Sequence, residues 1–252
     1  MIGKNLRNVI DDFAVSFEGN DIVAYNKLLF ETFPKTLFDP NYLESSSLLN
    51  DHDIKHGRGV VHSFAYQGAE LVLRHYRRGG IVAKFNHDKY FWSNLAKSRA
   101  MQEMQILNVL HKVGLPVPQP AAVRIQKNRF SYTADIVTVL IPHAKTLSTE
   151  LLSESVNDDE WCSIGKIIKK FHKHNCNHSD LNAHNIMLDS QRDVYLIDFD
   201  KSEIKASPGK WQKNNLQRLK RSLEKLAHED NGFNYRSSNF DSLMKGYGSQ
   251  SE

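Results

Sequence analysis

Three polar side chains that could carry out chemistry lie close together in the C-terminal half of this 252-residue chain. Asp180 and Asn185 precede two short apolar runs, 186–188 and 194–197, and Asp198 directly follows the second run. Polar residues separate the runs, which predicts the two strands and the turn of a β-hairpin. Folding of this hairpin would bring both carboxylates and the amide to the same edge.

These three groups suit the transfer of a phosphoryl group. Carboxylate and amide oxygens can bind Mg²⁺ while leaving positions for phosphate oxygens and water, so Asn185 and Asp198 are the candidate metal ligands. Phosphoryl transfer also needs a group that orients the nucleophile and accepts its proton, and Asp180 is the candidate base. The alternative is that these side chains only cap turns, as Asp and Asn often do.

The same stretch resembles the catalytic and metal-binding loops of the protein-kinase superfamily, in which H-R-D-L-x-x-x-x-N is followed by D-F-G. The spacing from Asp180 to Asn185 and on to Asp198 matches that pattern. Upstream, the chain also follows the superfamily's order of a glycine-containing hairpin, a basic strand residue and an acidic helix residue. The resemblance implies that four residues bind or position the phosphates of ATP: Gly57, Gly59, Arg74 and Glu103.

Longer blocks are similar to a narrower family, the 3-deoxy-D-manno-octulosonic acid (Kdo) kinases of Gram-negative lipopolysaccharide synthesis. The blocks are residues 72–80, 114–118, 180–185 and 196–200, and the resemblance extends over about residues 55–225. It implies a kinase-like fold, ATP and Mg²⁺ as cofactors, and phosphorylation of Kdo-lipid A at the O-4 hydroxyl of Kdo. It also implies a peripheral location at the cytoplasmic face of the bacterial inner membrane.

Four departures from the protein-kinase pattern bear on activity. Arg74 stands where a lysine is usual, and the two cations are not interchangeable, so a non-catalytic nucleotide-binding pseudokinase is one alternative. Ser179 replaces an arginine through which phosphorylation controls many protein kinases, and we expect that control to be absent. Asp200 replaces the glycine of D-F-G and either caps a turn or adds a carboxylate near the metal. No A-P-E segment follows, which favours a small or lipid-linked acceptor; a heptose kinase and a protein kinase remain alternatives.

The pattern of the first half of the chain predicts a small sheet and one main helix. Runs rich in β-branched and aromatic residues predict strands at 60–66, 71–76, 121–125 and 132–141. Between the second and third runs, apolar residues at three-residue spacing predict a helix over about 98–112 that Gly114 ends. Its apolar face would comprise Met101, Met104, Leu107, Leu110 and Val113.

The second half is predicted to be mainly helical around the hairpin. Helices are expected to begin near Ser148 and Asp158, the latter burying Trp161, Ile164, Ile168 and Phe171. Strands followed by helices predict an α+β fold with two lobes. We place an N-terminal sheet lobe over residues 1–141, a hinge at 142–147 and a truncated C-terminal helical lobe over 148–252.

Composition excludes several other classes of protein. A hydrophobic content of 40% is that of a globular chain, and no run of apolar residues reaches the length of a membrane span. Asp11 and Asp12 lie where a signal peptide would be apolar. The only cysteines, Cys162 and Cys176, form no disulfide framework, so we expect a reducing, cytoplasmic environment.

The net charge of +4 is too small to favour a nucleic-acid partner, but it is unevenly distributed. Residues 1–55 carry nine acidic and five basic side chains, whereas residues 201–226 carry eight basic and two acidic ones. Apolar residues recur within the basic segment and predict an amphipathic helix: Trp211, Leu216, Leu219, Leu223 and Leu226. Its cationic face is either simply solvated or faces an anionic membrane surface and acceptor. Arg77 and Arg78 are further candidates for acceptor contact.

Two residue clusters have both a structural and a functional interpretation. The alternating His172, His174, Cys176 and His178 suggest zinc, but zinc sites normally join two separated ligand pairs. We therefore expect the first two histidines to end a helix and His178 to support the loop by hydrogen bonding. The aromatic run 90–92 is expected in the core rather than at a lipid surface.

Overall fold

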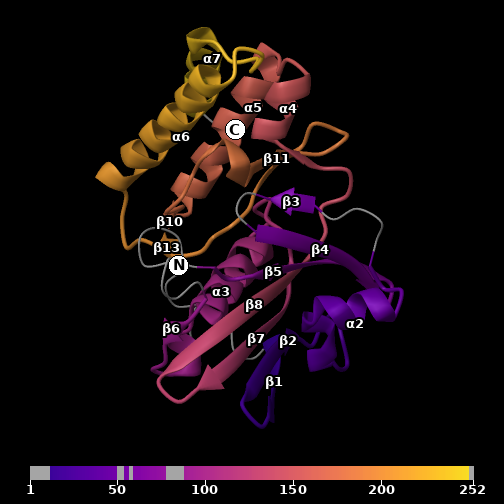
Figure 1. Cartoon of the computed structure of the whole chain (residues 1–252). Helices are drawn as coiled ribbons and strands as arrows, with labels where there is room; N and C mark the ends of the chain where they lie inside the picture. The colour runs from indigo at the N-terminus through magenta and orange to yellow at the C-terminus, as the bar shows by residue number, and fades with distance from the viewer. Residues whose placement is uncertain (1–11, 50–53, 57–58, 78–87, 250–252) are drawn as a thin grey trace. The chain divides into compact units, whose positions relative to one another are not determined.

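The computed structural model describes residues 12–49, 54–56, 59–77 and 88–249, and the chain divides into two compact units (Figure 1). The first, here called the sheet unit, comprises Lys4–Val109 and Pro118–Leu140. The second, the helical unit, comprises Leu110–Val117 and Ile141–Glu252, together with the first three residues of the chain. The predicted α+β class is confirmed. The division leaves Leu110–Val117 with the helical unit, although these residues lie within the predicted N-terminal lobe.

The sheet unit is built on an antiparallel sheet in which the described strands follow the order β1-β2-β7-β8-β5-β4-β3, with β6 paired to β8. The strands are β1 (Phe13–Glu18), β2 (Asp21–Asn26), β3 (Ile54–His56), β4 (Gly59–Tyr66), β5 (Ala69–His75), β6 (Tyr90–Phe91), β7 (Pro120–Asn128) and β8 (Ser131–Val139). The four strands predicted from the sequence correspond to β4, β5, β7 and β8. The aromatic run 90–92 is only partly in the core: Tyr90 is buried as predicted, but Phe91 is 77% exposed. Successive residues of a strand point to opposite faces of the sheet, so the two side chains have different surroundings.

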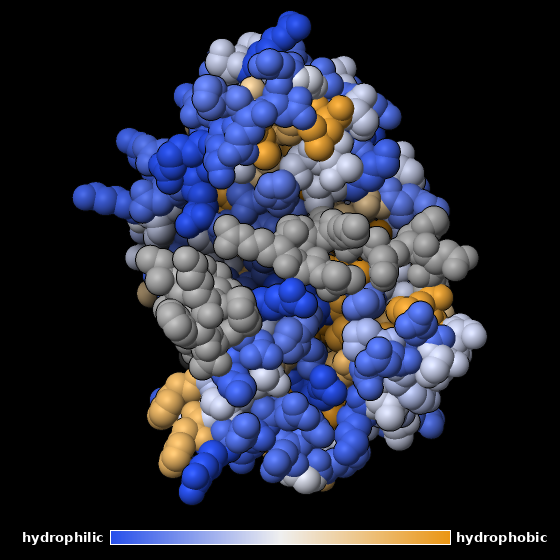
Figure 2. Space-filling view, in the orientation of Figure 1, coloured by the Kyte–Doolittle hydropathy of each residue, from blue (hydrophilic) through white to orange (hydrophobic). Residues whose placement is uncertain are grey.

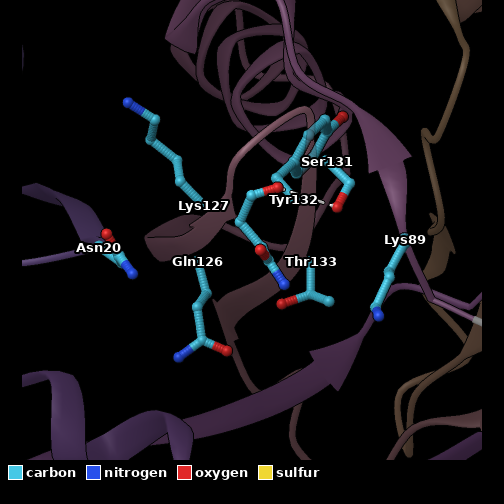
Figure 3. Close-up of a pocket in the computed structure, with 8 residues that line it drawn as sticks. Asn20, Lys89, Gln126, Lys127, Ser131, Tyr132 and Thr133 are labelled. Atoms are coloured by element: carbon cyan, nitrogen blue, oxygen red, sulfur yellow. Dashed lines mark hydrogen bonds between the residues drawn. The ribbon is translucent and has the colours of Figure 1, made fainter.

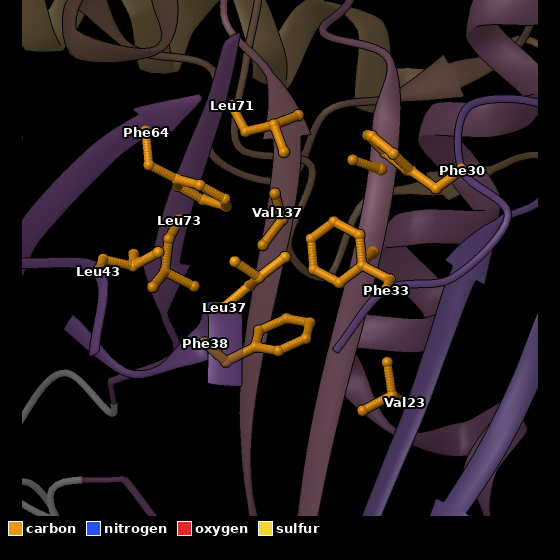
Figure 4. Packing of buried hydrophobic residues seen from close by; sticks show 12 residues of the cluster. Val23, Phe30, Phe33, Leu37, Phe38, Leu43, Phe64, Leu71, Leu73 and Val137 are labelled. Atoms are coloured by element: carbon orange, nitrogen blue, oxygen red, sulfur yellow. The ribbon is translucent and has the colours of Figure 1, made fainter. Parts of the chain in front are cut away.

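The N-terminal segment supplies a hydrophobic cover for this sheet that the sequence did not predict. After the β1–β2 hairpin, the short helices η2 (Lys35–Phe38) and α2 (Pro40–Ser45) follow, and the Asp39 side chain caps α2 by accepting from the Asn41 N–H at 3.0 Å. Phe30 and Phe33 pack edge to face, with ring centroids 5.3 Å apart. Figure 4 shows these rings and Phe38, Leu43 and neighbouring residues packed together with Phe64, Leu71 and Val137 of the sheet.

Helix α3 (Arg99–Lys112) follows η4 (Leu95–Lys97) and matches the predicted helix. Met101, Met104, Leu107 and Leu110 are at most 2% exposed, but Val113 is 38% exposed, so its assignment to the buried face was wrong. Helix α3 ends at Lys112, so Val113 lies in the turn that follows the helix and not on its buried face. Gly114, at φ 74°, ends the helix in the left-handed conformation.

The helical unit contains α4 (Leu147–Ser153), α5 (Asp158–Lys173), α6 (Lys210–Glu229) and α7 (Ser237–Gly248). Its short strands are β9 (Lys145–Thr146), β10 (Cys176–Asn177), β11 (Ile186–Leu188), β12 (Val194–Leu196) and β13 (Glu203–Ile204), with η5 (Ala183–Asn185) before β11. Helix α5 begins with a reciprocal cap: the Asn157 N–H donates to Glu160 Oε2 at 2.7 Å, and the Glu160 N–H donates to Asn157 Oδ1 at 3.0 Å. Its four predicted core residues are all buried.

Helix α7 was not predicted, and it packs closely against α5. At Gly165 of α5 an added Cβ would lie 2.0 Å from the Leu243 carbonyl oxygen, and at Gly246 of α7 it would lie 2.0 Å from the Cys162 carbonyl oxygen. The two backbones can approach this closely only because neither glycine has a side chain. Within the described residues, no helix is both long enough and apolar enough to span a membrane.

Candidate active site

The predicted hairpin after residue 185 is present and positions the candidate residues of the helical unit. Strands β11 and β12 pair antiparallel, with Ile186 opposite Leu196, and β11 also pairs with β9. The Asp189 side chain closes the turn by accepting from the backbone N–H groups of Gln191 and Asp193, each at 2.9 Å. The hairpin is thus held by β9 along β11 and by Asp189 at its turn.

The loop before the hairpin and the segment after it are joined by backbone hydrogen bonds. The Ile197 N–H donates to the Asn185 carbonyl at 3.1 Å, which places Asp198 one residue beyond that contact. The Asn185 side-chain amide donates to the Asp180 carbonyl at 2.9 Å, and Asn182 donates to the same carbonyl at 2.9 Å. The structure therefore brings Asp180, Asn185 and Asp198 to one edge, as the sequence predicted.

His178 supports this arrangement in the way the sequence predicted. Its ring is buried; Nδ1 accepts from the Asp180 N–H at 3.3 Å, so Nε2 carries the proton and donates to the Ile197 carbonyl at 2.9 Å. Burial lowers the pKa of His178, and the neutral ring can therefore fill both roles near pH 7. One imidazole thereby joins the backbone of Asp180 to that of Ile197, the residue before Asp198.

The segment that follows the hairpin is fixed by a buried aromatic ring and a turn. Asp198 adopts φ 60°, a left-handed conformation that Asp tolerates better than most residues. Phe199 is fully buried and stacks on Phe171 of α5, with centroids 5.9 Å apart. The Ser179 hydroxyl donates to the Asp200 carbonyl at 2.8 Å, and the Ser202 N–H donates to the Phe199 carbonyl at 2.9 Å. Asp200 thus lies in a turn, as one of its two interpretations requires.

Helix α6 contributes polar contacts to the loop that the sequence did not indicate. The Asn215 side-chain amide donates to the His178 carbonyl at 2.9 Å, and the Ala183 N–H donates to the Ser222 hydroxyl at 3.3 Å. Arg218, between Asn215 and Ser222 on the same helix face, donates from Nη1 to Asp180 Oδ1 at 2.5 Å. Both charged side chains of this pair are about half exposed. The sequence marked Arg218 only as one of the cations of the basic segment 201–226, and it gave no sign of the pairing with Asp180 or of the role of Asn215.

The histidines of the suggested zinc cluster have other partners. His172 accepts at Nδ1 from the Tyr247 hydroxyl at 2.8 Å and donates from Nε2 to Asn215 Oδ1 at 3.3 Å, which joins α5, α6 and α7. His174 is the residue that ends α5, and Cys176 is buried in β10. Among the described residues, no group of three or more His, Cys, Asp and Glu side chains is arranged to hold a metal ion.

The sheet unit holds the residues predicted to position a nucleotide. Arg74 of β5 donates from Nη2 to both carboxylate oxygens of Glu103, at 2.6 and 2.7 Å, and Glu103 is buried. The Tyr76 hydroxyl also donates to Glu103, and the Arg74 guanidinium lies 4.9 Å from the Tyr76 ring centre. The structure thus brings together the two residues that the sequence paired. Gly59 begins β4, whereas Gly57 lies outside the described residues, as does Arg78.

Comparison with known proteins gives one consistent result. The sequence model of the lipopolysaccharide kinase (Kdo/WaaP) family matches residues 52–247. The chain is 41% identical over 169 residues to a 3-deoxy-D-manno-octulosonic acid kinase of Vibrio cholerae, covering 67% of this chain and 72% of the relative. A protein of the same name from Haemophilus influenzae is 42% identical over 67% of this chain and 73% of its own. A third, from Vibrio vulnificus, is 33% identical over 92% of this chain and 97% of its own.

Proposed function

Because this chain belongs to the lipopolysaccharide kinase (Kdo/WaaP) family, we propose that it uses ATP to phosphorylate Kdo-lipid A at the O-4 hydroxyl of Kdo. The reaction would form part of the synthesis of the lipopolysaccharide inner core. Similarity to relatives named 3-deoxy-D-manno-octulosonic acid kinase supports the sugar. The observation that carries the chemistry is the hydrogen-bonded edge at which Asp180, Asn185 and Asp198 lie.

We propose that Asn185 and Asp198 would hold Mg²⁺, and their donor atoms fit that ion. The Asn185 side chain donates from Nδ2 to the Asp180 carbonyl, which fixes the amide so that its oxygen is the atom left to act as a ligand. Asp198 adds a carboxylate oxygen, the hard donor that Mg²⁺ prefers. When bound, the ion would offset the negative charge of the phosphates during transfer. The contribution of the chain is to hold the two oxygen donors by backbone hydrogen bonds.

Asp180 is proposed as the base that orients the acceptor hydroxyl. The bond between the hydroxyl oxygen and the transferred phosphorus forms as the bond to the leaving ADP oxygen breaks, and the hydroxyl proton passes to the Asp180 carboxylate. Two amide donors fix its backbone carbonyl and Arg218 fixes one carboxylate oxygen. The half-exposed carboxylate is accessible to an incoming hydroxyl group.

Arg74, Glu103, Gly57 and Gly59 are proposed to position the phosphates of ATP. The buried Glu103 holds the Arg74 guanidinium by charge-assisted hydrogen bonds, which fixes the direction of its planar fork. A guanidinium has five N–H donors, so one group can serve a carboxylate and a phosphate oxygen together. This pairing supports an active site in which arginine stands at the usual lysine position.

A peripheral location at the cytoplasmic face of the inner membrane is part of the proposal. The acceptor is lipid-linked, and α6 exposes most of the cations of the basic segment while burying Leu216, Leu219 and Leu223. Basic side chains near an anionic membrane contribute about 1 kcal/mol each. The cationic face of α6 is therefore proposed to contact anionic headgroups and the acceptor.

The deciding experiment incubates the purified chain with Mg²⁺ and ATP labelled at the γ-phosphate. Kdo-lipid A, a heptose-bearing core and a protein substrate are supplied in separate reactions, and mass spectrometry locates the added phosphate. We expect transfer to Kdo-lipid A, with fragmentation placing the phosphate on O-4 of Kdo. Label on heptose or protein alone would reject the proposed acceptor, and ATP binding without transfer to any substrate would favour a pseudokinase.

A further inference from the structure

Two phenylalanine side chains project from one end of the sheet in the sheet unit. Phe91 of β6 is 77% exposed, and Phe130, in the turn between β7 and β8, is 72% exposed. The two are neighbours: Phe91 pairs with Ser131, and the Trp92 N–H donates to the Phe130 carbonyl at 2.9 Å. Figure 2 shows an orange protrusion at the lower left, where Figure 1 places the turn between β7 and β8. A fixed backbone thus presents two large apolar side chains to solvent.

One cation lies beside the Phe130 ring and another beside neighbouring Trp92, while nearby acidic side chains are paired with other cations. Lys127 Nζ lies 4.9 Å from the Trp92 ring centre, and the Arg129 guanidinium lies 5.9 Å from that of Phe130. On the adjacent β1–β2 hairpin, Glu18 and Asp21 both lie within 4 Å of Lys35 Nζ, at 3.2 and 3.8 Å. Asp88 lies 3.7 Å from His75 Nε2. Within the described residues, neither Lys127 nor Arg129 forms an ion pair with an acidic side chain.

A polar hollow of about 320 Å³ opens beside the same turn (Figure 3). Its lining includes Lys89 and Lys127, with hydroxyl and amide groups from Ser131, Thr133 and Gln126. Figure 3 shows the Lys127 side chain extending away from Gln126 and Thr133. The Lys89 cation and several neutral hydrogen-bonding groups suit an anionic, oxygen-rich group such as a phosphate ester. Apolar rings and a polar hollow therefore lie side by side.

We propose that this end of the sheet docks on an anionic lipid bilayer. Phe91 and Phe130 would enter the interfacial layer, and Lys89, Lys127 and Arg129 would bind headgroup phosphates. We call these five residues the aromatic tip. The inference builds on the proposed function, whose acceptor is lipid-linked, and it adds a membrane contact separate from α6.

The chemistry favours a bilayer over a protein partner. Protein interfaces are depleted of lysine, whereas an aromatic ring flanked by flexible cations matches the apolar-to-anionic gradient of a membrane surface. Lys and Arg can keep their charged ends among phosphates while the rings lie deeper. The tip also projects as a narrow turn, which can enter between headgroups.

The test measures co-sedimentation of the full chain with vesicles of phosphatidylcholine alone and of phosphatidylcholine mixed with phosphatidylglycerol. Wild type should bind the mixed vesicles, and the double variant Phe91→Ser/Phe130→Ser should partition at least about tenfold less, since two large apolar groups are lost. Phe130→Trp should retain binding. Leu28→Ser is the matched control, because Leu28 is 72% exposed but follows the opposite end of β2. Lys127→Glu/Arg129→Glu should weaken binding to the anionic vesicles selectively.

Wild-type partition of the double serine variant would overturn the inference, as would loss of binding only with the α6 variant Lys213→Glu/Arg221→Glu. Sedimentation without vesicles provides a further check: a wild-type dimer that the serine variant dissociates would instead assign the tip to self-association. Circular dichroism should be unchanged in the variants, because both rings are solvent-exposed. The vesicle assay needs no acceptor, so its failure is distinct from failure to phosphorylate detergent-dispersed Kdo-lipid A.

Discussion

Asp180 is held at both its backbone and its side chain. Its carbonyl accepts from Asn182 and Asn185, its N–H donates to His178, and its carboxylate accepts from Arg218. A loop residue rarely has so many fixed contacts by chance, since loops are usually more mobile than the elements they join. The contacts limit the positions that the carboxylate can take, which is what a base that must meet a hydroxyl group requires.

Replacement of this carboxylate tests its chemical role. We expect Asp180→Ala to lower the turnover of Kdo-lipid A phosphorylation by about 10² to 10⁴, the usual contribution of a general base. ATP binding should be retained, and Asp241→Ala, which removes an exposed carboxylate of α7, should remain near wild type. Turnover of the Asp180 variant close to wild type in a steady-state assay would reject the assignment.

Arg218 should act through Asp180. Arg218→Ala is expected to reduce kcat by a few-fold to about tenfold, a modest effect because both partners are half exposed. Arg218→Lys should recover part of the loss, and the KM for ATP should change little. Arg236→Ala is the control, because Arg236 is an exposed arginine of the same unit that precedes α7.

A double-mutant cycle separates this role from general stabilisation. In an Asp180→Asn background, Arg218→Ala should cause little further loss, since the partner of the guanidinium has already changed. Additive losses in the two backgrounds would show that Arg218 acts independently of Asp180. Equal thermal unfolding midpoints of the single variants would show that the losses of activity do not come from a folding defect.

At the scale of elements, the close packing of α5 and α7 depends on two glycines. Gly246→Ala would place a methyl group 2.0 Å from the Cys162 carbonyl oxygen, so the helices must separate. Overpacking of this kind costs about 1 to 3 kcal/mol, and we expect a lower thermal midpoint for Gly246→Ala and for Gly165→Ala. Gly248→Ala in the same helix meets no atom within 4 Å and should be neutral or stabilising. A wild-type midpoint for Gly246→Ala would contradict the packing.

His172, where α5, α6 and α7 meet, should make stability depend on pH. Burial lowers the pKa of His172 to about 4, from 6.5 in an exposed chain. Between these values the unfolded chain binds a proton at this residue and the folded chain does not, so the free energy of unfolding falls as the pH is lowered through this window. One such group changes the free energy of unfolding by up to about 1.4 kcal/mol per pH unit.

Urea unfolding at several pH values between 7 and about 4 measures this dependence, with the range set by the two pKa values. His172→Gln should show a shallower fall than wild type, although its stability at neutral pH is expected to be lower because the contact with Tyr247 changes. Comparison of the two slopes cancels the contributions of the other titrating groups. Identical slopes would show that His172 does not titrate differently on folding.

At the scale of the whole chain, the net charge of +4 combines an acidic N-terminal segment with a basic segment at residues 201–226. The electrostatic part of membrane association should therefore weaken with salt. Raising the ionic strength from about 0.1 to about 1 M shortens the Debye length from about 10 to about 3 Å. Binding to anionic vesicles should drop across that range, and a residual fraction should depend on Phe91 and Phe130.

Vesicle co-sedimentation over a salt series checks this expectation, with neutral vesicles as the reference. Binding that is independent of salt would contradict an electrostatic role for the cations of α6. Loss of the residual fraction in the double serine variant would separate the apolar contribution of the aromatic tip from the ionic one.

Local sequence patterns were sufficient to predict the helices and strands that have regular apolar spacing. The buried face of α5, the four principal strands and the hairpin after Asn185 could all be predicted, because period and turn residues are properties of neighbouring positions. The β1–β2 hairpin and the aromatic cover were missed, since acidic and polar residues interrupt their apolar pattern. Helix α7 was missed because glycine and serine lower its helical signal although its packing on α5 stabilises it.

The sequence by itself determined the family and the candidate chemistry, because Asp180, Asn185 and Asp198 stand at spacings that a hairpin converts into proximity. Only the tertiary structure decided which residues from distant segments join them. Arg218 meets Asp180, and Asn215 binds His178, because α6 packs beside a loop more than thirty residues earlier in the chain. Likewise, Phe91 and Phe130 become one surface only when β6 pairs with β8. Such contacts depend on how elements pack, and no local period in the chain encodes them.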